Sequence, residues 1–556
     1  MTKKFSLLFF SVVLVIGCGK NGGNNPTPPL PTPTSFTFIS LKVNGTYNGF
    51  TYYGINTTPI IKFSFSVPIN RISVNNAFSF KDDNGATISF NSSYENNDST
   101  VVIQYLSPLR FITKYSLTVS TDLKSQAGGS LQSSITVSLT TAIDSSDKFP
   151  LISDNALLDL VQQQTFKYFW DFAHPVSGLA RERNTSGETI TSGGSGFGIM
   201  AIVSGITKNF ISRAQGLTRM QTIVGFLKNT AQRFHGAYPH WLNGTTGVVI
   251  PFSNKDNGAD IVETSYLMQG LLTARQFFNG TDATETALRN DINSIWHGVE
   301  WNWFRQNNQN VLYWHWSPNY NWDMNVQVRG WNECLITYVL AASSASYSIP
   351  KIVYVNGWAI NGGIINNNSY YGFNLPLGPA FGGPLFFEQY SFLGINPNGL
   401  SDAYASYQTQ TINHTKINYE YCKNNPLGYY GYSNLCWGLT ASDIPGGYTA
   451  SSPTNDVGVI APTAALSSFP FTPTESMQAL KFFYYKLGDK LWGQYGFKDA
   501  FSLHNPWFAD SYLAIDEGPI IVMIENYRTG LLWNLFTSCP EVKAGMRTLG
   551  FTAPYL

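Results

Sequence analysis

The sequence predicts a mainly α fold in which an (α/α)6 barrel follows a small all-β sandwich. Residues 36–143 alternate apolar and polar side chains with a period of two, which is typical of half-buried strands. After residue 147 the apolar period changes to about 3.6, the period of an α-helix. The 556 residues also exceed what one ordinary core holds, so we expect one small domain and one large one.

The first residues have the features of an exported lipoprotein. Lys3 and Lys4 precede an apolar run that is too short to span a bilayer, as in a secretory signal. Gly17-Cys18 at its end resembles a bacterial lipobox, which implies removal of residues 1–17 and lipidation of Cys18. Residues 18–35, rich in Gly, Asn, Pro and Thr, should form an extended spacer. We expect an outer-membrane lipoprotein that faces the periplasm or the cell surface.

Short strands separated by turns fill residues 36–143. Alternating segments occur at 61–65, 101–105 and 115–119, and turn signals occur at 83–85 and 127–129. This pattern predicts a β-sandwich. The run KYSLTVSTDLKSQAGGSLQSSITVSLTTA resembles the end of a bacterial Ig-like domain. The segment has no pair of acids and no histidine cluster, so it is interpreted as a spacer or an accessory binding module.

Helices dominate residues 150–553. Ser153 and Asp154 begin one helix, and Ser212 with Gln215 forms a capping box for a second. Further helices are expected at 196–207, 260–279, 284–304, 330–345, 384–394, 400–424, 455–467, 474–487, 518–529 and 540–549. About a dozen helices with long loops suit a double ring of inner and outer helices with a cleft at one end. An irregular solenoid or a large bundle remains an alternative, although no fixed repeat supports it.

The composition points to a neutral partner. Charged residues make up 12% of the chain, aromatic residues 15%, and the formal net charge is zero. Such a surface does not suit a phosphate backbone, so no nucleic acid is expected. Aromatic rings and amides fit sugar faces and hydroxyls, and we expect a polysaccharide or oligosaccharide substrate bound by a monomer.

The cysteines indicate neither metal nor thiol chemistry. Apart from Cys18, the chain has Cys334, Cys422, Cys436 and Cys539, without the spacing of a zinc site. Export would permit Cys422 and Cys436 to form a disulfide, but the sequence does not decide whether they do. We expect no metal and no cofactor.

Acidic residues at three places are the catalytic candidates. Asp256, Asp260 and Glu263 have spacings of four and three, which point three carboxylates the same way on a helix or in the loop before it. Glu333 adjoins Cys, Leu and Ile, where partial desolvation would raise its pKa as a general acid requires. Asp516 and Glu517 precede Gly518-Pro519, and one of them is expected to cap a helix.

The loops between helices carry many rings and imidazoles. Flat indole faces stack on sugar rings, and polar edges bind hydroxyls. The substrate-binding candidates are His240, Trp241, Trp314, His315, Trp316, Trp322, Arg329, Asn413 and His414.

A family resemblance adds to this interpretation. Residues 151–552 resemble the bacterial glucoamylase-like domain, and more narrowly glycoside hydrolase family 144, whose members cleave β-1,2-glucan. The matching stretches include YFWDFAHPVSGLARERN, RFHGAYPHWLNGTTG, PFSNKDNGADIVETSYLMQGLL, RGWNECLITYVLAASS and DSYLAIDEGPIIVMIENYRTGLLW. The resemblance implies an (α/α)6 barrel and an inverting mechanism without a cofactor.

The same resemblance implies roles for the acids. Glu333 would be the general acid and Asp516 the base or the group that orients water. Asp256, Asp260 and Glu263 would bind sugar hydroxyls and relay a proton. Two carboxylates in different environments are what glycoside hydrolysis needs.

We therefore expect a lipid-anchored β-1,2-glucanase that releases sophoro-oligosaccharides. A hydrolase of another β-linked glucan or oligosaccharide is the first alternative, because a changed loop could alter the linkage preference without altering the acids. The second alternative is a glycan-binding lipoprotein that has no turnover.

Overall fold

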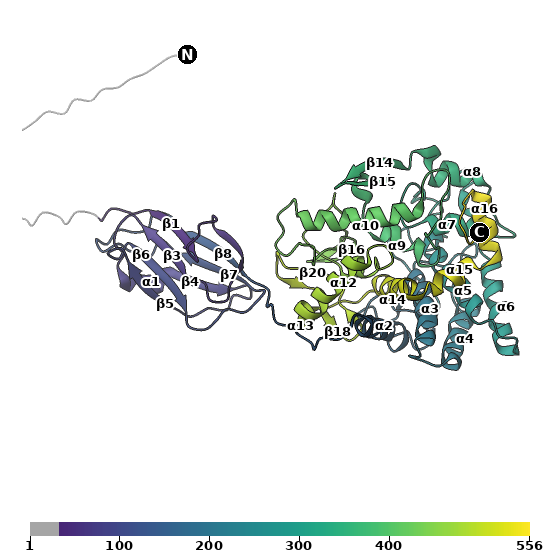
Figure 1. The fold of residues 1–556 in the computed structure, drawn as a ribbon, viewed down its shortest axis with the longest axis horizontal. Helices are drawn as coiled ribbons and strands as arrows, with labels where there is room; N and C mark the ends of the chain where they lie inside the picture. Colours follow the sequence, from purple (N-terminus) through teal and green to yellow (C-terminus); the bar gives the residue numbers. More distant parts are fainter. Residues whose placement is uncertain (1–32) are drawn as a thin grey trace, which may run out of the picture.

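The computed structural model describes residues 33–556, which form two domains joined by a short linker (Figure 1). The first domain contains β1 to β8, and the second begins with α2 (Asp154–Trp170) and ends with α16 (Pro540–Leu549). This order confirms the predicted fold class. The predicted signal segment, Cys18 and most of the predicted spacer lie outside the described residues.

The first domain is a sandwich of two four-stranded sheets. One sheet has the order β1-β3-β6-β5 and the other β2-β8-β7-β4, with β2 parallel to β8. Alternate residues of both sheets, such as Phe63 and Leu117, face a shared apolar core. The strands are β1 (Phe38–Val43), β2 (Thr51–Ile55), β3 (Ile61–Phe65), β4 (Phe78–Asp82), β5 (Phe90–Glu95), β6 (Thr100–Tyr105), β7 (Lys114–Val119) and β8 (Ile135–Thr141), and α1 (Arg71–Ala77) precedes β4.

The sandwich packs directly on the helical domain. The ring of Tyr53 stacks on His504 with centroids 4.4 Å apart, and its hydroxyl lies 2.8 Å from Nε2 of that histidine. Ile112, in the loop before β7, belongs to an apolar cluster of the helical domain. The two domains therefore share apolar surface.

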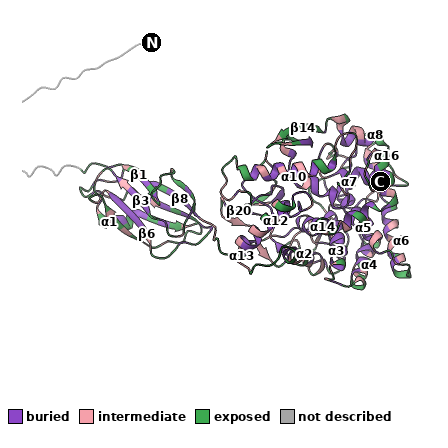
Figure 2. Ribbon diagram, viewed as in Figure 1, coloured by how far each residue is buried: buried purple, intermediate pink, exposed green. Residues whose placement is uncertain are grey.

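The centre of the second domain is built from helices that are buried along most of their length. These are α3 (Ser192–Thr207), α5 (Ile261–Phe277), α7 (Leu335–Ser343) and α14 (Ala514–Thr529), drawn mostly as buried in Figure 2. Helix α3 packs against both α5 and α14. A Cβ at Gly196 would lie 2.1 Å from the carbonyl oxygen of Tyr266, so α3 and α5 pack backbone against backbone.

Helices with one exposed face surround this centre. The predicted capping box of Ser212 and Gln215 is present, and Ser153 caps α2 as predicted. The helices are α2, α4 (Arg213–Asn229), α6 (Ala283–His297), α10 (Tyr407–Asn424), α12 (Pro473–Lys481), α13 (Leu487–Leu491), α15 (Leu531–Thr537) and α16, with short turns α8 (Lys351–Val353) and α9 (Phe386–Gln389). The short helix α11 (Pro462–Leu466) is buried along its whole length.

Several predicted helix boundaries were wrong. The helix expected at 284–304 ends at His297, because Gly298 closes it and a separate 3-10 turn follows at Trp301–Arg305. The helix expected at 400–424 begins at Tyr407, because Ser406 caps it.

The start of α14 also corrects a prediction. The helix begins at Ala514, four residues before the predicted start, because the backbone N–H of Glu517 already donates to the carbonyl oxygen of Leu513. Neither Asp516 nor Glu517 is therefore the helix cap. Both lie in the first turn of the helix.

Short antiparallel strands organise the connecting loops. The strands β9 (Thr189–Thr191), β10 (Trp241–Asn243) and β11 (Val249–Ile250) form one sheet. The remaining strands pair two by two: β12 (Ala259–Asp260) with β13 (His315–Trp316), β14 (Ile365–Tyr370) with β15 (Phe373–Leu377), β16 (Ala441–Ile444) with β17 (Gly447–Ala450), β18 (Trp492–Gly493) with β19 (Gly496–Phe497), and β20 (Phe501–Ser502) with β21 (Trp507–Phe508).

The described cysteines are all free. Cys334, Cys422, Cys436 and Cys539 are buried, so the disulfide that export would permit between Cys422 and Cys436 is not formed. Cys422 and Cys436 instead pack as apolar side chains in one cluster. Within residues 33–556, no helix combines the length and the apolar character that crossing a membrane requires.

Candidate active site

A cavity of about 420 Å³ opens where several helices of the second domain begin. Its walls contain residues from the first turn, or from just before the first turn, of α3, α5, α7, α9 and α14. Helix N-termini carry partial positive charge and stabilise nearby carboxylates. The lining residues are Glu182, Arg183, Thr191, His240, Trp241, Phe252, Glu263, Tyr266, Trp314, Glu333, Phe386, Tyr390, Ala441, Tyr448, Ala450, Leu513 and Ile515.

Asp260 caps the buried helix α5. Its Oδ1 accepts the backbone N–H groups of Val262 and Glu263 at 3.0 and 2.9 Å. Its Oδ2 accepts a hydrogen bond of 3.1 Å from Nδ1 of His240. The DNGADIVE stretch therefore uses Asp260 to begin the helix and to hold an imidazole at the cavity wall.

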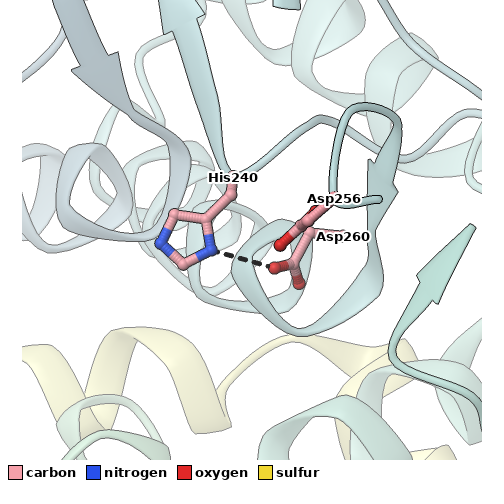
Figure 3. A group of neighbouring side chains, drawn as sticks. All are labelled: His240, Asp256 and Asp260. Atoms are coloured by element: carbon pink, nitrogen blue, oxygen red, sulfur yellow. Dashed lines mark hydrogen bonds and ion pairs between the residues drawn. The ribbon is translucent and has the colours of Figure 1, made fainter. Parts of the chain in front are cut away.

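Asp256 lies beside Asp260 and His240 (Figure 3), and His315 completes the cluster. Pairing of β12 with β13 puts His315 opposite Asp260, and its Nε2 lies 3.4 Å from Oδ2 of Asp256 and 3.7 Å from Oδ2 of Asp260. Both aspartates are fully buried. The second oxygen of Asp256, Oδ1, has no hydrogen-bond partner among the described residues.

The cluster has an uneven distribution of charge. Burial would lower the pKa of His240, but the charges of Glu263 and Asp260 raise it to about 9, so this imidazole is protonated at neutral pH. Burial also opposes ionisation of Asp260, yet its hydrogen bond from His240 lowers its pKa. Burial and the neighbouring Asp260 raise the pKa of Asp256 to about 7. Asp260 and His240 thus form an ion pair beside a carboxyl group that exchanges its proton near neutral pH.

Glu263 lies in the first turn of α5 and faces the cavity. Its Oε2 accepts the backbone N–H of Gly193 at 2.7 Å, and its Oε1 lies 4.0 Å from Nε2 of His240. Burial raises the pKa of Glu263, and His240 opposes the rise. The predicted trio is therefore brought together, but only Glu263 of the three lines the cavity.

The same cluster has ligand atoms that suit a cation. One ligand atom each of His240, Asp256 and Asp260 lies within 4.8 Å of the others. The His240–Asp260 hydrogen bond, however, already pairs the two groups. A cation there would have to displace the proton that they share.

Glu333 lies two residues before α7 at the cavity wall. Its carbonyl oxygen accepts the hydroxyl of Ser391 at 2.5 Å, which fixes the backbone. Burial, with the negative charges of Glu263 and Asp260, raises the pKa of Glu333 to about 7. A carboxylic acid with such a pKa can donate a proton at neutral pH and then take up another from solvent.

Asp516 lies behind the cavity and not on its surface. Ile515 lines the cavity, whereas Asp516 is fully buried and bonded to Asp499. Burial and the charge of Asp499 raise the pKa of Asp516 well above its usual range, so Asp516 holds a proton and donates it to Asp499. Oδ2 of Asp499 also accepts the backbone N–H of Asp443 at 2.6 Å.

Aromatic side chains from two loops line the cavity. Trp241 and Trp314, both predicted from the sequence, are among them. Phe252, which the sequence reasoning missed, stacks on His240 with centroids 4.1 Å apart and is 49% exposed. This half-exposed ring at the rim offers an apolar face to a ligand.

Other predicted binding residues lie elsewhere. Trp316 and Trp322 both pack on Trp303, with centroids 5.3 and 4.6 Å from it. His414 is buried in the core, where Nε2 donates to the carbonyl oxygen of Gly383 and Nδ1 lies 3.2 Å from Glu388. Asn413 and Arg329 make polar contacts with neighbouring loops, Asn413 with the carbonyl oxygen of Asn374 and Arg329 with Gln327.

The sequence reasoning also missed polar groups of the cavity. Glu182 and Arg183 follow Arg181, so three charged residues succeed one another in a chain with few charges. That run was a usable signal. Tyr266, Tyr390 and Tyr448 gave none, because tyrosine is frequent throughout the chain.

Comparisons with known proteins agree with the two-domain division. The family model named Glycoamylase, a glucoamylase family, matches residues 325–540. The model of a bacterial Ig-like domain matches residues 41–141, which is the region of the sandwich.

A relative with a known name matches most of the chain. The chain is 46% identical over 428 residues to the exo β-1,2-glucooligosaccharide sophorohydrolase (non-reducing end) of Parabacteroides distasonis. The match covers 73% of this chain and 59% of that protein's length.

Solved structures extend the likeness. The endo-β-1,2-glucanase of Chitinophaga pinensis, in complex with sophorotriose and glucose, is 52% identical, with a TM-score of 0.71 over 73% of this chain and 100% of that one. A β-1,2-glucanase of Parabacteroides distasonis is 38% identical, with a TM-score of 0.70 over 94% of this chain and 74% of that one. The second match extends beyond the helical domain.

Proposed function

Because this chain belongs to the bacterial glucoamylase-like family that contains these β-1,2-glucanases, we propose that it is a glycoside hydrolase that cleaves β-1,2-glucan to sophoro-oligosaccharides. The observation that carries the proposal is Glu333, an acid with a pKa of about 7 on the wall of a cavity that also contains Glu263 and aromatic rings. A carboxylic acid beside ionised carboxylates is the arrangement that glycoside hydrolysis uses.

Glu333 is the general acid of this proposal. Its proton passes to the glycosidic oxygen as the bond from that oxygen to the anomeric carbon breaks. The alternative donors are less suitable. His240 has a pKa of about 9 and is held in an ion pair with Asp260, and Asp256 does not line the cavity. Glu333 is therefore the donor whose pKa, about 7, matches neutral pH, as a general acid requires.

The second role belongs to the pair of Asp516 and Asp499. In an inverting reaction a water attacks the anomeric carbon on the face opposite the leaving oxygen and loses a proton to a carboxylate. The two buried aspartates share a hydrogen bond and together can take up one proton. Asp516 directly follows Ile515, which lines the cavity, so the pair lies immediately behind the wall at the first turn of α14.

The remaining polar groups bind the sugar. Glu263 and His240 present an acceptor and a donor to the cavity, and Asp260 fixes both of them through α5 and the imidazole. Trp241, Trp314 and Phe252 supply ring faces for glucosyl units. A site of this composition recognises a neutral chain of hydroxyls and apolar ring faces.

Hydrolysis of defined glucans tests the proposal. The protein is incubated with linear β-1,2-glucan and, separately, with β-1,3- and β-1,4-glucans, and the products are separated by chromatography. Release of sophoro-oligosaccharides from the first substrate alone is expected. Release of products only from another glucan would contradict the proposed β-1,2 specificity. Binding without release of products would show that the protein binds glycans but does not hydrolyse them.

We also propose that the protein is a monomer anchored to the outer membrane by a lipid on Cys18, with the sandwich as a spacer. The support is the lipobox-like sequence and the Pro/Thr-rich spacer that follows it. Cells that express the full chain and its Cys18→Ala variant are labelled with a radioactive fatty acid. Label in the wild type alone is expected, and equal label in both would contradict the anchor.

A further inference from the structure

Two charged residues of the cavity wall have no role in the reaction described above. Glu182 and Arg183 lie in the loop between α2 and β9, and both line the cavity. The side chain of Glu182 is 16% exposed and that of Arg183 is 30% exposed. They stand on the wall near the start of α14, since Arg183 forms a backbone bridge with Leu513.

Arg183 holds the carboxylate of Glu182 in one orientation. Its Nε donates to both carboxylate oxygens at 3.0 Å. Its Nη1 donates to both oxygens of Asp443 at 3.2 Å. The planar guanidinium thus ties the loop to the hairpin of β16 and β17, which carries Tyr448 to the cavity.

The backbone of Glu182 is fixed as well. Its N–H donates to the carbonyl oxygen of Thr189 at 3.1 Å, and its own carbonyl oxygen accepts the N–H of Ala514 at 3.0 Å. Ala514 is the first residue of α14. The position of the carboxylate is therefore fixed by contacts to β9, to the start of α14 and, through Arg183, to β16.

The carboxylate of Glu182 keeps unused acceptor capacity. An ionised carboxylate has about four lone-pair sites, and within residues 33–556 only Arg183 donates hydrogen bonds to this one. Burial raises the pKa of Glu182, and the charge of Arg183 opposes the rise. A fixed carboxylate with free lone pairs at a cavity wall can accept further hydrogen bonds from the hydroxyls of a neutral sugar.

We propose that Glu182 is a substrate-binding carboxylate that accepts hydrogen bonds from the hydroxyls of a glucosyl unit in the cavity, and that Arg183 is a positioning residue for it. This inference rests on the proposed function of the cavity. Glu182 contacts the sugar, and Arg183 acts through Glu182 and through the hairpin that Asp443 anchors.

Affinity in an inactive background tests the role of Glu182. Binding of a linear β-1,2-gluco-oligosaccharide is measured by calorimetry for Glu333→Gln and for Glu333→Gln with Glu182→Gln. A hydrogen bond to a charged acceptor is lost, so affinity should fall at least about 10-fold. Glu182→Asp keeps the charge but shortens the side chain by one methylene, so it should lower the affinity less. This variant replaces Glu182→Gln in the test if the glutamine variant folds poorly.

A matched ion pair outside the cavity provides the control. Glu285 accepts from Nε and Nη2 of Arg213 at 2.7 and 2.9 Å, and its side chain is 6% exposed, compared with 16% for Glu182. Glu285→Gln should lower the melting temperature and leave the affinity unchanged. A purely structural role of Glu182 would make the two glutamine variants behave alike.

The role of Arg183 has its own readout. Arg183→Lys keeps a positive charge but loses the second arm to Asp443, so KM should rise several-fold while the pH profile of kcat keeps its shape. Unchanged affinity on Glu182→Gln, with hydrolysis by the wild type intact, would overturn this inference alone. Absence of hydrolysis and binding in the wild type would overturn the proposed function first.

Discussion

The carboxylate of Glu263 accepts a hydrogen bond of 2.7 Å from the backbone N–H of Gly193. This bond joins the first turn of α5 to the first turn of α3. The first N–H groups of a helix have no partner inside it, so a carboxylate from a neighbouring helix satisfies one of them. Glu263 is thereby held in one orientation at the cavity wall.

Alanine at position 193 should disable the site. A Cβ there would lie 2.4 Å from Oε2 of Glu263 and would displace it. Because small displacements of site groups are costly, we expect kcat/KM on β-1,2-glucan to fall about 100-fold. Gly225→Ala is the control, since a Cβ at Gly225 meets nothing within 4 Å. Equal activity of the two variants would contradict the role of this contact.

Removing the proton donor should abolish turnover but not binding. For Glu333→Gln we expect kcat to fall by about 10²- to 10⁴-fold, the usual contribution of a general acid. Oligosaccharide affinity should stay close to that of the wild type, because the ring faces and Glu263 are unchanged. Glu300→Gln, at a half-exposed glutamate bonded to His235, should have normal kcat. Full activity of Glu333→Gln would contradict the assignment of Glu333 as the general acid.

The rate should fall on the alkaline side as Glu333 ionises. A general acid works only when protonated, so a pKa of about 7 means that kcat declines as the pH rises through about 7. Steady-state kinetics across a pH series measures this limb. A rate that holds its value up to a pH of about 9 would contradict Glu333 as the donor.

His240 should make stability depend on pH. Its pKa is about 9 in the folded protein and 6.5 as an ordinary histidine. A raised pKa contributes stability that is fully present below pH 6.5 and is lost as the pH rises through about 9. The contribution is on the order of 3 kcal/mol in the free energy of unfolding. Urea unfolding followed by tryptophan fluorescence should show this decline in the wild type and a flatter dependence in His240→Gln. Parallel curves would contradict the ion pair.

Asp516 and Asp499 should act as one unit. We expect Asp516→Asn and Asp499→Asn each to reduce kcat strongly, and the double variant to be little worse than either single variant, because the pair shares one proton. A double-mutant cycle of kcat values measures the coupling. Additive losses would show that the two carboxyl groups work separately.

The sequence predicts those parts of the fold and site that depend on local pattern. The spacing of Asp256, Asp260 and Glu263 predicts that their carboxylates gather on a helix or in the loop before it, and α5 begins at Ile261. Alternation predicts the strands at 61–65 and 115–119, and the capping box predicts the start of α4. Each of these depends on residues close together in the chain.

Long-range partners decide the rest. The pairing of Asp516 with Asp499 and of Arg183 with Asp443 joins segments that no periodicity connects. His414 looks like a loop ligand in the sequence, yet α10 turns it towards the buried Glu388. The short hairpins around the cavity have two to six residues per strand, too few for a pattern to be read.

The anomeric configuration of the first product tests the central claim most directly. A proton NMR time course follows the wild type with linear β-1,2-glucan from the first minutes. Inverting hydrolysis predicts that the new reducing ends appear first as the α-anomer and then mutarotate, with no product from Glu333→Gln. Initial β-anomer, or no product from the wild type, would contradict the account.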